Sequence, residues 1–336
     1  MQTKTNEKGK KTTMTNNDNV PFYKSAQFWK STGIFWALVA LVIVMAFSQP
    51  AFLTRPNLIN ILKQASITGV LAVGMTMVLL TGGIDLGVGS VLGVACMAAA
   101  YATTEDQGWP ILVAFLIGIG VGAVFGFING VGIAYVGFAP FIMTMATLSA
   151  ARGLALVSTN NRPIFNLSEQ FIDVSNSIYF GLPSLIYYFL GVTILAYVLT
   201  KKTVFGKWIY AVGGNENAAR YSGINVKRVK IIIYTIMGSL SGLTGVLMAS
   251  RITSGNPVVG DGYELDAIAA CVIGGVSLSG GSGSVIGTVI GVLILGVISN
   301  GFDILGISSN YQRIMKGLVI LFAVFIDIRS RMRKNN

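Results

Sequence analysis

The stretch KKTVFGKWIYAVGGNENAARYSGINVKRVK, residues 201–230, is a polar island in an otherwise apolar chain. It holds seven basic residues and a single acid, Glu216. Apolar stretches long enough to span a membrane flank it on both sides. Because basic loops between spanning helices stay in the cytoplasm, this loop predicts the orientation of the whole protein.

The same loop carries the signals of a short helix. Asn215 is suited to cap its N-terminus, with Glu216 in the first turn and Arg220 one turn later on the same face. Gly223 stands where a glycine commonly ends a helix. A small ordered helix on a cytoplasmic loop favours a docking role. A simple turn at the two glycines before Asn215 is compatible with that role.

Composition defines the broad class. Of 336 residues, 53% are apolar and only 11% are charged, so the chain is predicted to be an integral membrane protein. The net charge of +11 does not indicate nucleic acid. Of 24 basic residues, six lie in 1–30, seven in 201–230 and four after Asp327, beside apolar spans as in cytoplasmic segments. No histidine is present, which excludes His-based acid–base catalysis and His-ligated metals; we predict no metal site.

Apolar runs predict an all-α, polytopic fold of about ten spans. The domain division is a cytoplasmic polar tail (1–30), a transmembrane domain (31–328) and a second cytoplasmic tail (329–336). The loops expected outside, which lean acidic, are 103–110, 159–182, 251–263 and 301–312. The predicted spans are 31–49, 58–80, 86–102, 111–134, 139–158, 183–200, 231–250, 264–280, 284–300 and 313–327.

Two glycine-rich segments, 81–90 and 274–287, interrupt apolar runs and indicate broken or re-entrant helices. Gly82 to Ser90 resembles Gly274 to Ser282 in sequence. Paired broken segments in the two halves of a transporter point towards its pathway. Chance similarity between glycine-rich membrane hairpins is the alternative, and we give it the greater weight.

Polar residues inside the spans are few. Asp85 stands at a predicted helix start, where an N-cap role accounts for it. For Arg152, as for Lys63, snorkelling towards the outer surface explains the charge at least as well as a pathway role does. For Asn129 we favour a hydrogen bond between helices over contact with a solute.

Residues 261–264 match a capping box at the start of the eighth span. Contact of this region with an external protein is an equally weighted alternative. Glu264 and Asp266 are candidates for the rim of a pathway.

The chain has no phosphate-loop motif, so we expect that it is not itself an ATPase. A membrane pathway without a visible motor, together with a cytoplasmic docking helix, favours a motor on another polypeptide. The alternative is a self-sufficient carrier or channel driven by a gradient. A membrane scaffold without transport is disfavoured by the glycine-broken spans.

Several stretches resemble the permease subunits of ribose-type ABC importers over nearly all of residues 30–328. Two small departures are Gly87, where the family usually has serine, and Tyr221, where leucine is more usual. The matching segments are VGMTMVLLTGGIDLGVGSVLG (73–93), FINGVGIAYVGFAPFIMTMATLSAARG (127–153), AVGGNENAARYSGINV (211–226), GYELDAIAACVIGGVSLSGGSGSVIGTVIG (262–291) and NGFDILGISSNYQRIMKGLVILFAV (300–324).

The resemblance implies a multi-pass protein of a prokaryotic plasma (inner) membrane with the ten-helix fold of the vitamin B12 permease type. It implies a second permease, either another copy or a sister chain, in contact with membrane lipid. Two ATPase subunits would bind ATP and Mg at the cytoplasmic face, while this chain holds no cofactor. An extracytoplasmic sugar-binding protein would deliver the solute, which the sequence does not specify beyond a monosaccharide or similar molecule.

In that family the loop after the sixth span carries a helix that contacts the ATPase, and 201–230 follows our sixth span. The resemblance therefore assigns ATPase coupling to a short run of this loop. The residues are Gly213, Gly214, Asn215, Glu216, Ala218, Ala219, Arg220, Ser222 and Gly223.

Overall fold

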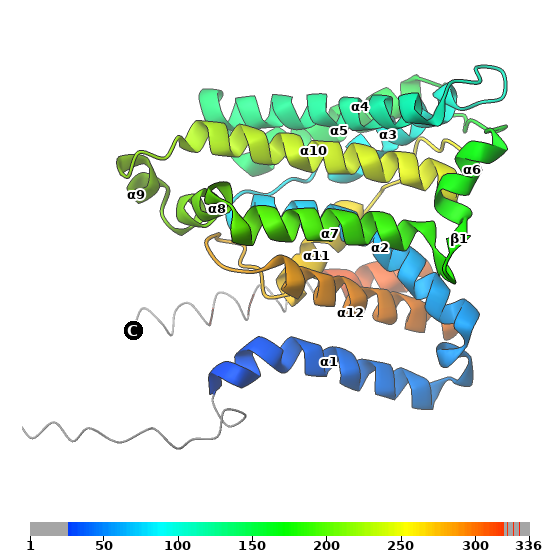
Figure 1. Cartoon of the computed structure of the whole chain (residues 1–336), viewed down its shortest axis with the longest axis horizontal. Coiled ribbons are helices and arrows are strands. Elements are labelled where there is room, and N and C mark those ends of the chain that lie inside the picture. Colours follow the sequence, from blue (N-terminus) through cyan, green and yellow to red (C-terminus); the bar gives the residue numbers. More distant parts are fainter. Residues whose placement is uncertain (1–25, 319–320, 322–324, 326–328, 330–336) are drawn as a thin grey trace, which may run out of the picture.

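The computed structural model describes residues 26–318, 321, 325 and 329. The predicted polar tails, 1–30 and 329–336, lie almost entirely outside the described residues, as does much of the predicted span 313–327. Within the described part, long helices lie side by side in one bundle (Figure 1).

The elements follow one another along the chain as helices with a single small hairpin, and helical residues 309–318 come after the last of them. In order they are α1 (Ala26–Ser48), η2 (Pro50–Leu53), α2 (Arg55–Leu80), α3 (Val88–Ala102), α4 (Ile111–Val131), η3 (Gly132–Val136), α5 (Pro140–Val157), α6 (Glu169–Asn176), β1 (Ile178–Tyr179), β2 (Leu182–Pro183), α7 (Ser184–Lys202), α8 (Val204–Gly214), α9 (Glu216–Tyr221), α10 (Val226–Arg251), α11 (Tyr263–Ile273) and α12 (Val285–Ile304).

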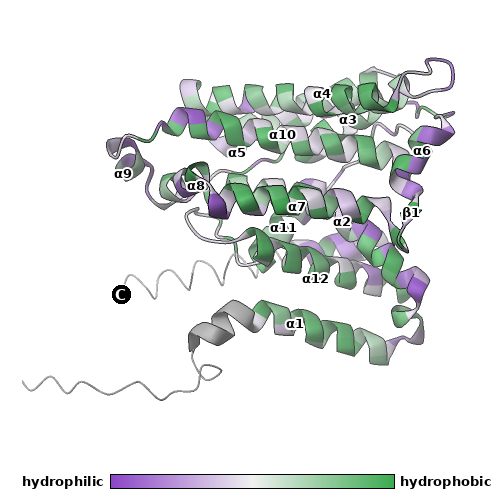
Figure 2. Ribbon diagram, in the orientation of Figure 1, coloured by the Kyte–Doolittle hydropathy of each residue, from purple (hydrophilic) through white to green (hydrophobic). Residues whose placement is uncertain are grey.

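Six described helices are long and apolar enough to cross a membrane: α2, α4 continued through η3, α5, α7, α10 and α12. Residues 33–48 of α1 and all of α3 form shorter apolar helices. A helical, multi-spanning architecture is therefore confirmed, while the count of ten spans stays a prediction. Figure 2 shows apolar residues along the bundle and hydrophilic ones at its two ends, around α9 and α6.

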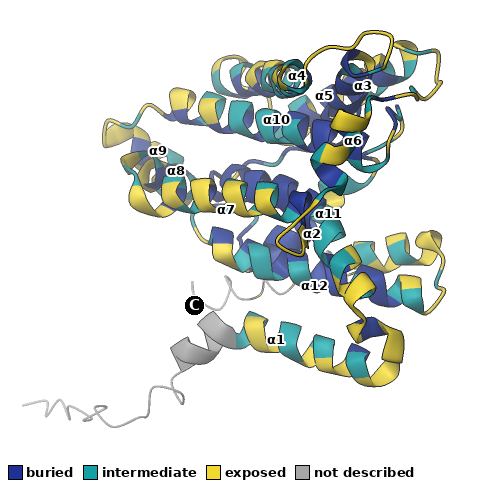
Figure 3. Cartoon of the chain, turned by 45° about the vertical axis from the view of Figure 1, so that its right-hand side comes forward, coloured by how far each residue is buried: buried dark blue, intermediate teal, exposed yellow. Residues whose placement is uncertain are grey.

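The core is built around α2 and α10. Both are buried over most of their length, whereas much of α4, α5 and α7 faces outward (Figure 3). Helix α10 packs on α4 at very short range, because glycines of one helix face the backbone of the other. The outward faces of α4, α5 and α7 are apolar, as expected for surfaces that meet lipid or another membrane subunit.

At one end of the bundle, three of the predicted outer loops join each other. Thr104 pairs with Leu167, and Ile164 with Gly255, as isolated antiparallel bridges. The loops 103–110, 159–182 and 251–263 therefore lie on the same side, as the sequence predicts. The short helix α6 and the hairpin β1–β2, which ends at Pro183, were not predicted.

Both predicted glycine-rich helix breaks are present in the structure. They lie near α8, at the end of the bundle opposite the joined loops. Each preceding helix ends in a glycine with left-handed backbone, Gly82 (φ 77°) after α2 and Gly275 (φ 81°) after α11. The predicted span 264–280 was too long, since α11 already ends at Ile273 and the chain is non-helical from Gly274 to Ser284.

Candidate functional site

The short helix in the polar loop forms as its sequence predicts. The Oδ1 atom of Asn215 accepts a hydrogen bond from the Ala218 amide at 3.0 Å, which caps α9. Within the helix, the Arg220 guanidinium lies 3.4 Å from the Glu216 carboxylate. Gly223 follows the helix with φ 84° and donates its amide to the Arg220 carbonyl. Between these ends, Ala219 is buried, whereas Asn217, Arg220 and Ser222 are exposed, so α9 presents a largely polar outer face.

Glu216 also has a partner that sequence reasoning missed. The Lys230 ammonium lies 2.8 Å from the other oxygen of its carboxylate. Lys230 belongs to the beginning of α10, and its side chain is largely buried. Glu216 therefore ties α9 to a core helix through a short charge-assisted contact.

A second helix in the loop was also missed. Residues of α8 connect α7 to α9, and the helix begins where the Thr203 hydroxyl accepts from the Gly206 amide at 3.1 Å. Threonine followed by a helical run is an N-cap signal that could have revealed it.

The C-terminal end of α8 is wedged between the two glycine-rich breaks. A side chain on Gly213 would overlap the Leu80 carbonyl oxygen and would come within 2.6 Å of the Gly281 amide nitrogen. Those two breaks also bond directly, because the Gly281 amide donates to the Leu80 carbonyl at 2.9 Å. Nearby, the Tyr210 hydroxyl of α8 donates to the Gly283 carbonyl at 3.0 Å.

The polar loop is therefore in contact with the spans. Helix α8 touches both helix breaks, through the backbone at Gly213 and through the Tyr210 hydroxyl. A cavity of about 170 Å³ lies beside it, bordered by Glu216, Lys230 and residues 81–83. The docking helix α9 is thus joined through α8 to both helix breaks, and its Glu216 borders the same cavity as the first break.

Two buried polar residues near the first break, Asp85 and Asn129, have hydrogen-bond partners within the chain. Asp85 is not the N-cap of α3, which is Gly87; its carboxylate instead accepts from the Gly87 amide at 2.9 Å and shapes the turn before the helix. Asn129 of α4 accepts a hydrogen bond from the Thr147 hydroxyl of α5, so the predicted bond between helices is confirmed.

Arg152 reaches an outer loop. Its guanidinium donates to the carbonyls of Pro257 (2.7 Å) and Val259 (2.9 Å), and so holds the loop 252–262 against α5. Both bonds come from the same terminal nitrogen, whose two N–H groups serve the two acceptors. The sequence did not reveal these partners because they lie more than a hundred residues away.

The capping box at 261–264 was wrong. The N-cap of α11 is Gly262, in left-handed conformation, and no side chain caps the helix. The nearby acids pair instead with the helical residues after α12. Asp261 lies 3.1 Å from Arg313, and Asp266 lies 2.9 Å from Lys316. Together with Glu264, these four side chains line a cavity of about 230 Å³.

A bundle of apolar spanning helices, two broken helices in contact and a polar loop packed on them define a polytopic membrane permease. The family model described as "Branched-chain amino acid transport system / permease component" matches residues 57–324, and the chain belongs to that family.

The relatives are sugar import permeases. The ribose import permease protein of Bacillus subtilis (strain 168) is 46% identical over 297 residues, covering 88% of this chain and 92% of the relative. The ribose import permease protein of Escherichia coli (strain K12) is 42% identical, over 87% and 91%. The galactose/methyl galactoside import permease protein of the same strain is 38% identical, over 91% and 96%. No solved structure matches this chain.

Proposed function

We propose that this chain is the membrane permease subunit of an ATP-driven importer and forms the pathway for a monosaccharide. D-Ribose is the first solute to test, because the ribose import permeases share 42–46% identity with nearly the whole chain. The proposal rests on one observation: the backbone of Gly213 packs between Leu80 and Gly281. This wedge links the polar loop directly to both helix breaks.

The energy source in this proposal is ATP bound with Mg by two separate ATPase subunits. Support comes from the absence of a phosphate-loop motif in the chain and from the exposed, capped helix α9. The coupling residues are those at 213–216, 218–220 and 222–223. Motion of the ATPase would push α9, and α8 would pass that motion to the breaks.

The orientation follows from charge. We place α8, α9 and both tails in the cytoplasm, and α6 with the joined loops outside, where a sugar-binding protein delivers the solute. In Figure 1, α1 begins at the same end of the bundle as α8 and α9. A second permease, identical or sister, and lipid cover the exposed apolar faces, in a ten-helix fold of the vitamin B12 permease type.

Reconstitution distinguishes this function from a gradient-driven carrier. Proteoliposomes would contain either the chain alone, or the chain with the ATPase and binding protein encoded beside its gene. We expect D-ribose uptake only with the partners, internal ATP and Mg. Robust uptake by the chain alone under a proton, sodium or sugar gradient would overturn the proposal in favour of the carrier.

A further inference from the structure

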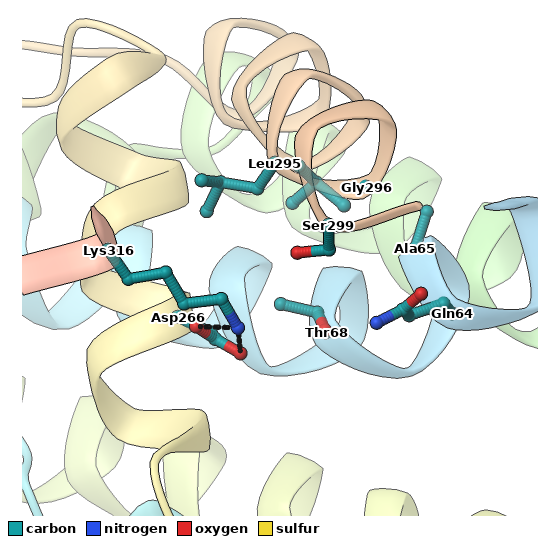
Figure 4. A pocket seen from close by; sticks show the side chains of 9 residues that line it. Gln64, Ala65, Thr68, Asp266, Leu295, Gly296, Ser299 and Lys316 are labelled. Carbon is teal, nitrogen blue, oxygen red and sulfur yellow. Dashed lines mark hydrogen bonds and ion pairs between the residues drawn. The ribbon is translucent and has the colours of Figure 1, made fainter. Parts of the chain in front are cut away.

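Five polar side chains from four elements meet inside the apolar part of the bundle (Figure 4). Gln64 and Thr68 come from α2, Asp266 from α11, Ser299 from α12, and Lys316 from the helical residues after α12. They line a cavity of about 20 Å³, and Figure 4 shows Gln64, Ser299 and the Asp266–Lys316 pair pointing toward one another.

One side of this cavity reaches far along α2, while Asp266 on the other side lies in the first turn of α11. Gln64 stands nine residues after the start of α2, about 13 Å along the helix at the usual rise per residue. Polar and charged groups at such depth cost free energy and mark a solute or ion pathway more often than a packing site.

The hydroxyl and amide groups of the site are unused. In the part of the chain that the structure describes, Asp266 and Lys316 pair at 2.9 Å, while the side chains of Gln64, Thr68 and Ser299 make no hydrogen bond. Ser299 is only 5% exposed. Helical serines in apolar surroundings commonly bond back to their own helix, as Ser66 does to the Leu62 carbonyl at 2.7 Å.

We propose that these residues form a binding site for a neutral, polyhydroxylated solute inside the permease, an inference that rests on the proposed function. The amide of Gln64 and the two hydroxyls offer both donors and acceptors, while the carboxylate accepts and the ammonium donates. The site can therefore serve a sugar hydroxyl both as hydrogen-bond donor and as acceptor. The charges of Asp266 and Lys316 cancel, which favours an uncharged ligand over an ion.

The cavity is small in this structure. A volume of about 20 Å³ accommodates little more than one water molecule. The larger cavity of about 230 Å³ is also lined by Asp266 and Lys316, so the ion pair stands between the two spaces. Separation of this pair, as the helix carrying Lys316 moves from α11, joins the cavities and admits the solute.

The test removes single polar groups while keeping side-chain shape: Ser299→Ala, Thr68→Val and Gln64→Met. Ser66→Ala is the matched control, since Ser66 is buried on the same helix as Thr68 but bonds to its own backbone. Each variant is reconstituted with the ATPase and D-ribose-loaded binding protein. The readouts are ribose uptake, ATP hydrolysis and complex assembly by gel filtration.

We expect about fivefold less ribose transported per ATP hydrolysed in each site variant, which is the usual effect of one lost neutral hydrogen bond. ATPase stimulation and assembly should persist, and Ser66→Ala should match the wild type. A purely structural role would instead lower uptake and ATPase together. Unchanged transport per ATP in all three variants overturns the solute site while wild-type ATP-dependent uptake still upholds the proposed function. Loss of uptake in the wild type overturns both.

Discussion

The α-carbon of Gly213 lies against the carbonyl oxygen of Leu80, so closely that no side chain fits between α8 and the end of α2. The same oxygen accepts the amide hydrogen of Gly281. One residue of the polar loop therefore touches the point where the two helix breaks join. Motion of α8 must therefore displace these breaks. The contact at Gly213 is backbone to backbone, so no flexible side chain can absorb the displacement.

Gly213→Ala tests this contact. The added methyl group overlaps the Leu80 oxygen and forces α8 away from the breaks, so ATP-driven ribose uptake by the reconstituted complex should fall by about tenfold or more. Gly191→Ala in α7 is the control, because Gly191 lies outside the coupling residues and no atom lies within 4 Å of a β-carbon there. Equal uptake by the two variants would contradict a coupling role for the wedge.

Glu216→Lys tests the capped helix. The change removes the carboxylate bound by Arg220 and Lys230 and places three positive side chains together. The cost in folding stability should stay below about 1 kcal/mol, since Glu216 is partly exposed and the pairs are screened. Uptake should nevertheless fall sharply, and ATPase activity should lose its stimulation by loaded binding protein. In the double variant Glu216→Lys/Lys230→Glu, the restored pair should recover part of both activities. Wild-type uptake by the assembled single variant would remove α9 from the mechanism.

Cysteine labelling tests the orientation. Both native cysteines are buried, so the background should be low. Single cysteines introduced at positions 10, 221 and 334 should resist a membrane-impermeant thiol reagent added outside intact cells, whereas Gln107→Cys and Gln170→Cys should react. Tyr221, Gln107 and Gln170 are all exposed, so reactivity reports the side of the membrane and not burial. The reverse labelling pattern would invert the topology.

Gly122→Ala tests the packing of α4 on α10. The new methyl group overlaps the Gly238 carbonyl, so the helices must separate, at a cost of about 1–3 kcal/mol. The melting temperature of the detergent-purified protein should drop by several degrees. Gly120→Ala has nothing within 4 Å and should melt like the wild type. A similar loss in both variants would contradict this contact as the cause, because Gly→Ala by itself raises helix propensity.

The sequence predicted much of the fold because the signals concerned are local. Apolar runs located the helices, although α11 proved shorter than its apolar run. The α9 helix was recognisable because Asn215, Glu216 and Gly223 act within one or two turns. The count of spans correctly predicted that the outer loops lie on the same side of the bundle. The helix α8 was overlooked despite a threonine N-cap, since its glycines resemble a turn.

By itself, then, the sequence determined an integral membrane permease with a capped helix in a basic loop, because hydropathy, capping and charge depend on neighbours in the chain. Only the tertiary structure decided which distant residues meet. Arg152 finds its carbonyls more than a hundred positions away, and Ser299 faces Gln64 across the bundle. Gly213 has no side chain, so its residue type does not indicate which residues it contacts. Because Gly213 has no β-carbon, the Leu80 carbonyl and the Gly281 amide can approach its backbone closely, and this approach is seen only in the packed structure.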